Sequence, residues 1–335
     1  MRFVGLVAAM LGLLAVACGP PPAGGPVELT VPDGAGFRSV VDSLDSRGVI
    51  GAPALFTLYA RVRGADRQVR SGRYRFETGV EWKEILDALT EGRVLTRSVT
   101  IPEGWTLGQM APRIAEISGS PPDSVLTLLS GDSAHLRFRV PGPGLEGYLF
   151  PDTYRFAEGV APERVVATMV EAYNGFWTPT RRARLDSLGM TEREVTTLAS
   201  IVQAEAGNME EMPLIAGVYH NRLEAGWRLE ADPTVLYALG GPRERLLFAA
   251  IDSVADHPYN TYRQAGLPPG PIGAPGAAAL SAALEPAEVP YMFFVAGPDG
   301  GHVFSTTLAE HNRAVAEYRR RRAGAANRGS GGTRP

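Results

Sequence analysis

The sequence has little cysteine and no large excess of acidic or basic residues. Its 335 residues include one cysteine, Cys18, which excludes a disulfide framework and any metal cluster built from cysteines. The 33 basic and 36 acidic residues leave a formal net charge of −3. Nucleic-acid binding depends on a clustered basic surface, so this near balance argues against nucleic acid as the main partner.

The N-terminal apolar run is too short for an ordinary membrane span. After Arg2, residues 3–17 are all apolar or small, whereas a spanning helix needs about 20 such residues. The run is typical of a signal peptide, and Leu14-Ala15-Val16-Ala17-Cys18 resembles a bacterial lipobox. We predict a lipoprotein-type signal peptide over residues 1–17 and lipidation of Cys18, with an uncleaved signal anchor as the alternative. Either anchor holds the rest of the chain outside the cytoplasmic membrane.

The remaining chain has the composition of a folded protein. A hydrophobic fraction of 44% excludes wholesale disorder, and the length predicts about two domains. Residues 18–26 are rich in proline and glycine and predict a tether. Residues 323–335 are mostly Gly, Ala, Arg and Ser and predict a disordered tail.

The first folded segment, residues 27–98, reads as a small α+β domain. Residues 27–31 and 72–76 have the patterns of strands, and residues 37–44 and 55–62 those of two helices between them. A further helix is expected over residues 81–89. This βααβ order suits a small carbohydrate-binding module or a generic spacer domain, which composition does not separate.

One phrase occurs twice in the chain. Residues 27–34 read as a strand ending in Pro-Asp-Gly before an amphipathic helix, and residues 100–104 end in Pro-Glu-Gly before another. We interpret this as a short duplication or as two uses of one βα unit. Residues 99–160 are expected to be a linking α+β segment, loop-rich over 119–144.

The helix expected after Thr191 carries an acid on its apolar face. Thr191 and Glu194 form a capping-box pattern, and Gly207-Asn208 predicts the end of the helix. The apolar stripe recurs every three or four residues, at Val195, Leu198, Val202 and Glu205. Burial raises the pKa of a carboxyl toward the range of a general acid. The alternative is a stripe-end glutamate that reaches solvent or pairs with an arginine.

Polar residues that suit sugar binding follow this helix. A second helix begins at Met212-Pro213 and carries Asn221, and Asp232 is expected to cap a short third helix. Residues 258–272 form a stiff Pro/Gly loop whose Asn, Thr and Tyr side chains suit sugar hydroxyls. Ordinary turn chemistry is the alternative for these residues.

Seven ordered motifs carry a family resemblance: L-E-G-Y-L-F-P-D-T-Y (145–154), A-S-I-V-Q-A-E-A (199–206), N-R-L-x-x-G (221–226), D-P-T-V-x-Y (232–237), P-Y-N-T-Y (258–262), G-L-P-P-G-P-I (266–272) and L-A-E-H-N (308–312). Together the motifs resemble the MltG (YceG-like) endolytic murein transglycosylases, over roughly residues 27–320. One departure is Gly273-Ala274, where the family commonly has an asparagine before the next proline; this puts fine positioning of substrate in doubt. The family is usually held by a transmembrane helix, whereas this chain carries a lipobox.

The resemblance implies the following fold and activity. A small LysM-like βααβ N-terminal domain precedes a larger α+β catalytic domain, residues 161–322. The enzyme cleaves the MurNAc–GlcNAc bond within peptidoglycan strands and leaves 1,6-anhydro-MurNAc ends. Glu205 is the catalytic acid. The expected substrate-binding residues, which position sugar or organise the site, are Asn221, Asp232, Thr234, Tyr237, Asn260, Thr261, Tyr262 and Glu146, the last a secondary acid candidate.

The resemblance also implies partners and a place of action. Peptidoglycan is the substrate, peptidoglycan synthases are partners, and the inner membrane is the favoured site of attachment. The five histidines lack the spacing of metal ligands, so we expect neither a metal nor a cofactor. Two alternatives stay open: a water-using muramidase with Asp232 or Glu146 as base, and a non-catalytic peptidoglycan-binding scaffold.

Overall fold

The computed structural model describes residues 25–131, 133–243, 246–297 and 300–329. The predicted signal peptide, Cys18 and most of the tether lie outside the described residues. Within the described part, no helix is long and apolar enough to cross a membrane. The chain divides into two compact units. The first extends to Ser98 and adds Ile117–Gly119 and Arg155–Ala161, and the second contains the remainder.

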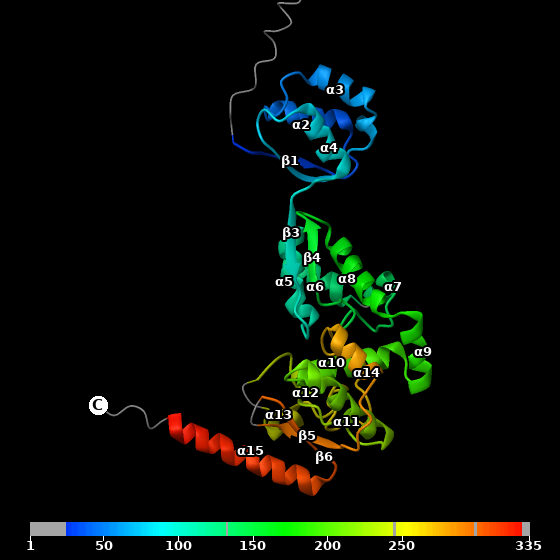
Figure 1. Cartoon of the computed structure of the whole chain (residues 1–335), viewed down its shortest axis with the longest axis vertical. Coiled ribbons are helices and arrows are strands. Elements are labelled where there is room, and N and C mark those ends of the chain that lie inside the picture. The colour runs from blue at the N-terminus through cyan, green and yellow to red at the C-terminus, as the bar shows by residue number, and fades with distance from the viewer. Residues whose placement is uncertain (1–24, 132, 244–245, 298–299, 330–335) are drawn as a thin grey trace, which may run out of the picture. The chain divides into compact units, whose positions relative to one another are not determined.

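The first unit is a two-stranded sheet with helices. Its elements are β1 (Val27–Val31), α2 (Phe37–Ser46), α3 (Pro53–Val62), the 3₁₀ turn η1 (Ala65–Arg67), β2 (Gly72–Phe76) and α4 (Trp82–Glu91) (Figure 1). β1 and β2 pair antiparallel, with Val27 opposite Phe76. One apolar core joins them, including Leu29, Leu44 and Phe56. The strands and helices expected here are present, and the LysM-like description stays a prediction.

The duplicated phrase has the same local structure in both places. Gly34 and Gly104 each follow a Pro-acid pair and have φ of +73° and +76°, a region that glycine enters without a steric penalty. Each glycine turns the chain from a strand, β1 or β3 (Thr96–Thr100), toward a helix, α2 or α5 (Leu107–Ser118). Both segments therefore have the strand, turn and helix that the sequence predicts.

The second unit is mainly helical, and in it β5 (Phe293–Ala296) pairs with β6 (His302–Ser305). β3 pairs with β4 (Thr153–Ala157), and each of these two strands contains residues of both units. The helices that follow α5 are α6 (Pro122–Ser130), α7 (Ala134–Phe138), α8 (Pro162–Phe176), α9 (Pro179–Leu188), α10 (Glu192–Glu205), η2 (Met209–Glu211), α11 (Met212–Glu224), α12 (Asp232–Ala238), α13 (Phe248–Ser253), α14 (Ala277–Leu284) and α15 (Leu308–Gly329). The α+β class expected from the sequence is confirmed.

Two local expectations are wrong. Residues 119–144 are not loop-rich, because α6 and α7 occupy much of this stretch; Pro122 starts α6, and Val125 and Leu129, one turn apart, are both buried. Helix α15 continues through Gly329, so residues 323–329 are helical rather than a disordered tail; their alanines favour a helix.

Helix α10 forms the centre of the second unit. It packs against α11, α12 and α14, and Figure 1 shows these four helices gathered together. Every residue from Val195 to Val202 is buried. Glu205, the last residue of the helix, follows this buried stretch by three positions.

Candidate active site

Glu205 is the last residue of α10, and local sequence determines where that helix begins and ends. Thr191 and Glu194 form the expected capping box: the Thr191 hydroxyl accepts from Glu194 N–H, and the Glu194 carboxylate accepts from Thr191 N–H at 2.8 Å. Val195, Leu198 and Val202 are fully buried, which confirms the apolar stripe. Glu205 continues that stripe and is itself partly exposed.

The surroundings of Glu205 favour its protonated form. Burial raises the pKa of Glu205 to about 7, a hydrogen bond from Tyr219 opposes this, and the nearby Asp232 carboxylate adds to it. The buried Tyr219 hydroxyl donates to Glu205 Oε1 over 3.0 Å. The Arg222 guanidinium lowers the same pKa, by less than the other three causes. A carboxyl with a pKa near neutral pH can both donate and accept a proton there.

Asp232 begins α12 but does not cap it. The N-cap is Ala231, and no side chain caps this helix, so the expected cap is wrong. The Asp232 carboxylate instead accepts from the Tyr262 hydroxyl at 2.6 Å. Asp232 is exposed, so a ligand can reach its carboxylate.

Three of the predicted sugar-contact residues are buried and use their polar atoms internally. The Thr234 and Thr261 hydroxyls are 2.8 Å apart, and Ala231 N–H donates to Thr261 Oγ1 at 3.0 Å. Asn260 donates to the carbonyls of Ile251 and Val254. All three are at most 1% exposed. The two threonines hold the start of α12 to the loop that carries Tyr262, and Asn260 holds that loop to the end of α13 (Phe248–Ser253).

Asn221 and Arg222 tie α11 to the segment before β5 and to the loop that follows α11. Asn221 donates to the carbonyls of Val289 and Tyr291, and Arg222 to those of Met292 and Leu229. Both amide hydrogens of Asn221 are thereby engaged. These bonds fix the helix that carries Tyr219.

Glu146 lies beside a cavity of about 690 Å³. Its carboxylate accepts from Leu107 N–H, the first of α5, at 3.1 Å and from the Tyr237 hydroxyl at 3.3 Å. Burial raises the pKa of Glu146 to about 7 against these two hydrogen bonds. The cavity wall also includes Ala204 and Pro233, the chain neighbours of Glu205 and Asp232, so the cavity borders the Glu205 site.

The Pro/Gly loop is fastened to α10. Arg193 donates to Pro269 O, the Ser200 hydroxyl accepts from Ile272 N–H, and Gln203 accepts from Gly276 N–H. Gly147 must lack a side chain, because a Cβ there would lie 2.3 Å from Pro271 and its φ is +84°. The L-E-G motif and the G-P-I motif therefore pack directly together. Ala274 exchanges backbone hydrogen bonds with residues 104 and 105.

The turn after Glu205 is held by the β5–β6 hairpin. Glu211 accepts from His302 N–H at 2.8 Å and pairs with the His302 ring at 2.9 Å. Gly207 lies so close to Gly300 O that a Cβ would come within 2.5 Å of it. This close approach accounts for a glycine immediately after the site.

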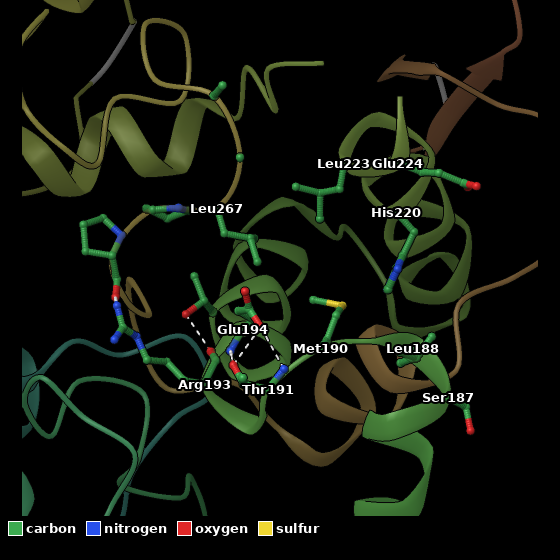
Figure 2. Close-up of a pocket in the computed structure, with 15 residues that line it drawn as sticks. Ser187, Leu188, Met190, Thr191, Arg193, Glu194, His220, Leu223, Glu224 and Leu267 are labelled. Carbon is green, nitrogen blue, oxygen red and sulfur yellow. Dashed lines mark hydrogen bonds between the residues drawn. The ribbon is translucent and has the colours of Figure 1, made fainter. Parts of the chain in front are cut away.

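A larger cavity, about 960 Å³, lies at the opposite end of α10. Figure 2 shows Thr191, Arg193 and Glu194 along one side of it and His220 and Leu223 of α11 on another. Glu194, on the wall of this cavity, lies 11 positions before Glu205. An α-helix rises about 1.5 Å per residue, so the cavity is remote from Glu205.

Two residues near Glu205 were not predicted as part of a site. Tyr219 and Arg222 share the apolar face of α11. An arginine on such a face is a sequence signal for a functional or structural site, since a buried charge needs partners. In the part of the chain that the structure describes, no group of three or more His, Cys, Asp or Glu residues could hold a metal ion.

Comparison of the chain with known proteins identifies a matching family. The family model described as YceG-like matches residues 29–317. The chain belongs to the YceG-like family. The match includes Glu205, Glu146 and every other candidate residue of this YceG-like protein outside the N-terminal segment.

Similar proteins include two endolytic murein transglycosylases. The one from Bacillus subtilis (strain 168) is 30% identical over 308 residues, which cover 87% of this chain and 84% of that protein. The one from Streptococcus pneumoniae (strain D39) is 28% identical over 327 residues, 87% of this chain and 58% of that protein. A crystal structure of a yceG-like protein from Listeria monocytogenes has a TM-score of 0.59 and 30% identity, covering 86% of this chain and 98% of that one.

Proposed function

We propose that this YceG-like protein is an endolytic lytic transglycosylase of peptidoglycan. It cleaves the β-1,4 bond between MurNAc and GlcNAc within a glycan strand and leaves a 1,6-anhydro-MurNAc end. One observation carries the proposal: Glu205 ends a largely buried helix, accepts a hydrogen bond from Tyr219, and has a pKa raised to about 7. The names of the relatives from Bacillus and Streptococcus support the same reaction.

In the first step, Glu205 acts as general acid. Its carboxyl proton passes to the glycosidic oxygen, the bond from C1 of MurNAc to that oxygen breaks, and GlcNAc leaves with a free 4-hydroxyl. Positive charge develops at C1 and its ring oxygen. The Asp232 carboxylate, held by Tyr262 at 2.6 Å, adds negative charge near Glu205 and keeps its proton on before the step.

In the second step, the same residue acts as general base. The 6-hydroxyl of MurNAc attacks C1 of its own ring, and its proton returns to the Glu205 carboxylate. No water is consumed, and the acid is regenerated. The attacking group belongs to the same molecule, so it has a high effective concentration. One carboxyl is therefore enough, where ordinary glycosidases need two.

The other site residues divide between contact and positioning. Asp232 and Tyr262 are candidates for contact with sugar, since Asp232 is exposed and Tyr262 is only partly buried. Asn260, Thr261 and Thr234 position the loop and helix that carry them. Asn221 positions α11 and therefore Tyr219.

The cavity beside Glu146 is the proposed place for a neighbouring sugar. It combines the Glu146 carboxyl and the Tyr237 hydroxyl with apolar surface from Leu236 and Ile272. The Tyr237 ring lies 4.9 Å from that of Tyr259. Sugars are bound by such combinations of hydrogen-bonding groups and ring faces.

The enzyme's location and partners follow from its substrate and its N-terminal sequence. We place it outside the cytoplasm, held by a lipid on Cys18 after removal of residues 1–17, with the inner membrane favoured. The LysM-like segment, residues 27–98, assists glycan binding. A membrane-held enzyme that cuts nascent strands terminates their elongation and acts beside peptidoglycan synthases. Loss of membrane association in Cys18→Ala would support the lipid anchor over an uncleaved signal anchor.

Digestion of purified glycan strands tests the activity. Products lighter than the hydrolytic ones by one water, with anhydro ends, support transglycosylation. Reducing ends would identify a water-using muramidase with Asp232 or Glu146 as base. Binding to strands without cleavage would identify a scaffold.

A further inference from the structure

Helix α3 of the first unit has an exposed apolar face. Leu55, Leu58 and Val62 are 60%, 59% and 81% exposed. They are three and four residues apart, so they share one side of the helix. The opposite side carries Phe56 and Ala60, which are fully buried in the core of the unit. The helix is therefore apolar on both sides, although only one side is covered by the protein.

The other helices of the same unit provide an internal comparison. α2, α3 and α4 are each ten residues long. The exposed positions of α2 include Arg38 and Asp42, and those of α4 include Lys83 and Glu84. Only α3 among these three presents leucine and valine to the outside. Contiguous exposed apolar surface commonly marks an interaction site.

Arginines are concentrated at the C-terminal end of α3 and in the segment that follows it. Arg61, Arg63, Arg67 and Arg70 occur there with a single acid, Asp66, and the Arg70 side chain lies against Gly92 at the end of α4. Among the described residues, none of the four arginines forms an ion pair with a carboxylate. Arg63 lies 5.0 Å above the ring of Tyr59. Arg63 also interacts, after Lys83, with the Asp87 carboxylate of α4, so the arginines are in excess over the nearby acids. An excess of positive charge beside an apolar face is the pattern of a helix that binds an anionic lipid surface.

The segment before β1 is long enough for this face to reach the membrane that holds the proposed anchor. Val27 is nine positions after Cys18, a reach of roughly 30 Å when extended. A domain of about 70 residues has a radius of gyration of roughly 11 Å. The reach is thus comparable to the diameter of the first unit, so the unit can turn any of its faces to the bilayer that holds the anchor.

We propose that the Leu55–Leu58–Val62 face of α3 docks on the surface of an anionic phospholipid membrane. The apolar side chains enter the boundary between headgroups and acyl chains, and the arginines contact lipid phosphates. Docking fixes the orientation of the first unit on the bilayer. The proposal rests on the envelope location given under the proposed function, but it requires no catalytic residue.

Fluorescence quenching in nanodiscs tests this docking with the full chain. Single copies of Leu58→Cys, labelled with an NBD fluorophore, are placed in discs with and without nitroxide-labelled acyl chains. Thr30→Cys, at an exposed position of β1, is the matched control, and the unsubstituted chain gives the background from Cys18. We expect the nitroxide lipid to quench position 58 by about twofold or more and position 30 hardly at all. The quenching should weaken when phosphatidylglycerol is replaced by phosphatidylcholine.

A second variant separates docking from mere proximity. Leu55→Ser combined with Val62→Ser should abolish the quenching at position 58 without unfolding the chain, which circular dichroism checks. Equal quenching at positions 58 and 30, no quenching at 58, or quenching that survives the double serine change would each overturn the proposal. A single copy per disc excludes contact between two α3 faces. Cleavage is measured on the same samples, so failure of docking and failure of the enzymatic function are read separately.

Discussion

The buried Tyr219 hydroxyl donates a hydrogen bond to Oε1 of Glu205 over 3.0 Å. This bond lowers the pKa of Glu205 against the larger effect of burial. The two residues come from different helices, α10 and α11. The bond therefore links the proton affinity of the proposed acid to the packing of the helix pair.

Tyr219→Phe should shift the pH dependence of cleavage. Removal of the donor raises the pKa of Glu205, so the loss of activity at high pH should move upward by about half to one pH unit, since a net hydrogen bond contributes about 0.5–1.5 kcal/mol. The measurement is kcat/KM against pH. Tyr173→Phe is the control, because the buried Tyr173 hydroxyl forms a hydrogen bond with Thr196 in the N-terminal half of α10, away from Glu205. An alkaline limb that stays in place in Tyr219→Phe would contradict the role given to the bond.

Stability should fall as pH rises through neutrality. The pKa values of Glu205 and Glu146 are raised to about 7, from 4.5. Between these values the unfolded chain has lost protons that the folded chain still holds, so rising pH favours unfolding. Each group accounts for at most about 3 kcal/mol.

The glutamine variants isolate these two contributions. Glu205→Gln and Glu146→Gln should each be more stable than the unsubstituted protein at pH 8. Each should also reduce the fall in the free energy of unfolding between pH 5 and pH 8. Urea denaturation at pH 5 and pH 8 measures this, with Glu224→Gln as an exposed control on α11. If both site variants followed the same pH curve as the unsubstituted protein, the raised pKa values would be wrong.

Thr261→Val should destabilise the fold and slow cleavage. The change leaves the buried Ala231 N–H without its acceptor. It also removes one of the two hydrogen bonds of the Thr234 hydroxyl, which keeps its bond to Ala231 O at 2.7 Å. The expected loss is about 1–3 kcal/mol in the free energy of unfolding. Thr127→Val is the control, since its exposed hydroxyl bonds only its own helix, and it should cost about 0.5 kcal/mol or less. A direct sugar contact by Thr261 would instead raise KM with little change in stability.

Local patterns predicted the element that carries Glu205. The capping box at Thr191 and the stripe ending at Glu205 depend on neighbours within one or two helical turns, and both are present. Helix α8 carries the same kind of local signal, because Val165, Val166, Met169 and Val170 are spaced for one buried face.

Long-range partners could not be predicted in the same way. Glu146 and Tyr237 are 91 residues apart, and Thr234 and Thr261 are 27 apart. A residue type determines what a side chain can bond, whereas the packing of distant segments determines which partner it meets. Asp232 illustrates this. Its position before a proline fits a helix cap, but its carboxylate accepts a hydrogen bond from the Tyr262 hydroxyl instead.

The origin of the new bond at C1 of MurNAc tests the central claim most directly. Glycan strands are digested in water that carries the heavy oxygen isotope, and the products are weighed by mass spectrometry. The account predicts anhydro ends without heavy oxygen from the unsubstituted protein, and no new ends from Glu205→Gln. Reducing ends that contain heavy oxygen, or undiminished cleavage by Glu205→Gln, would contradict it.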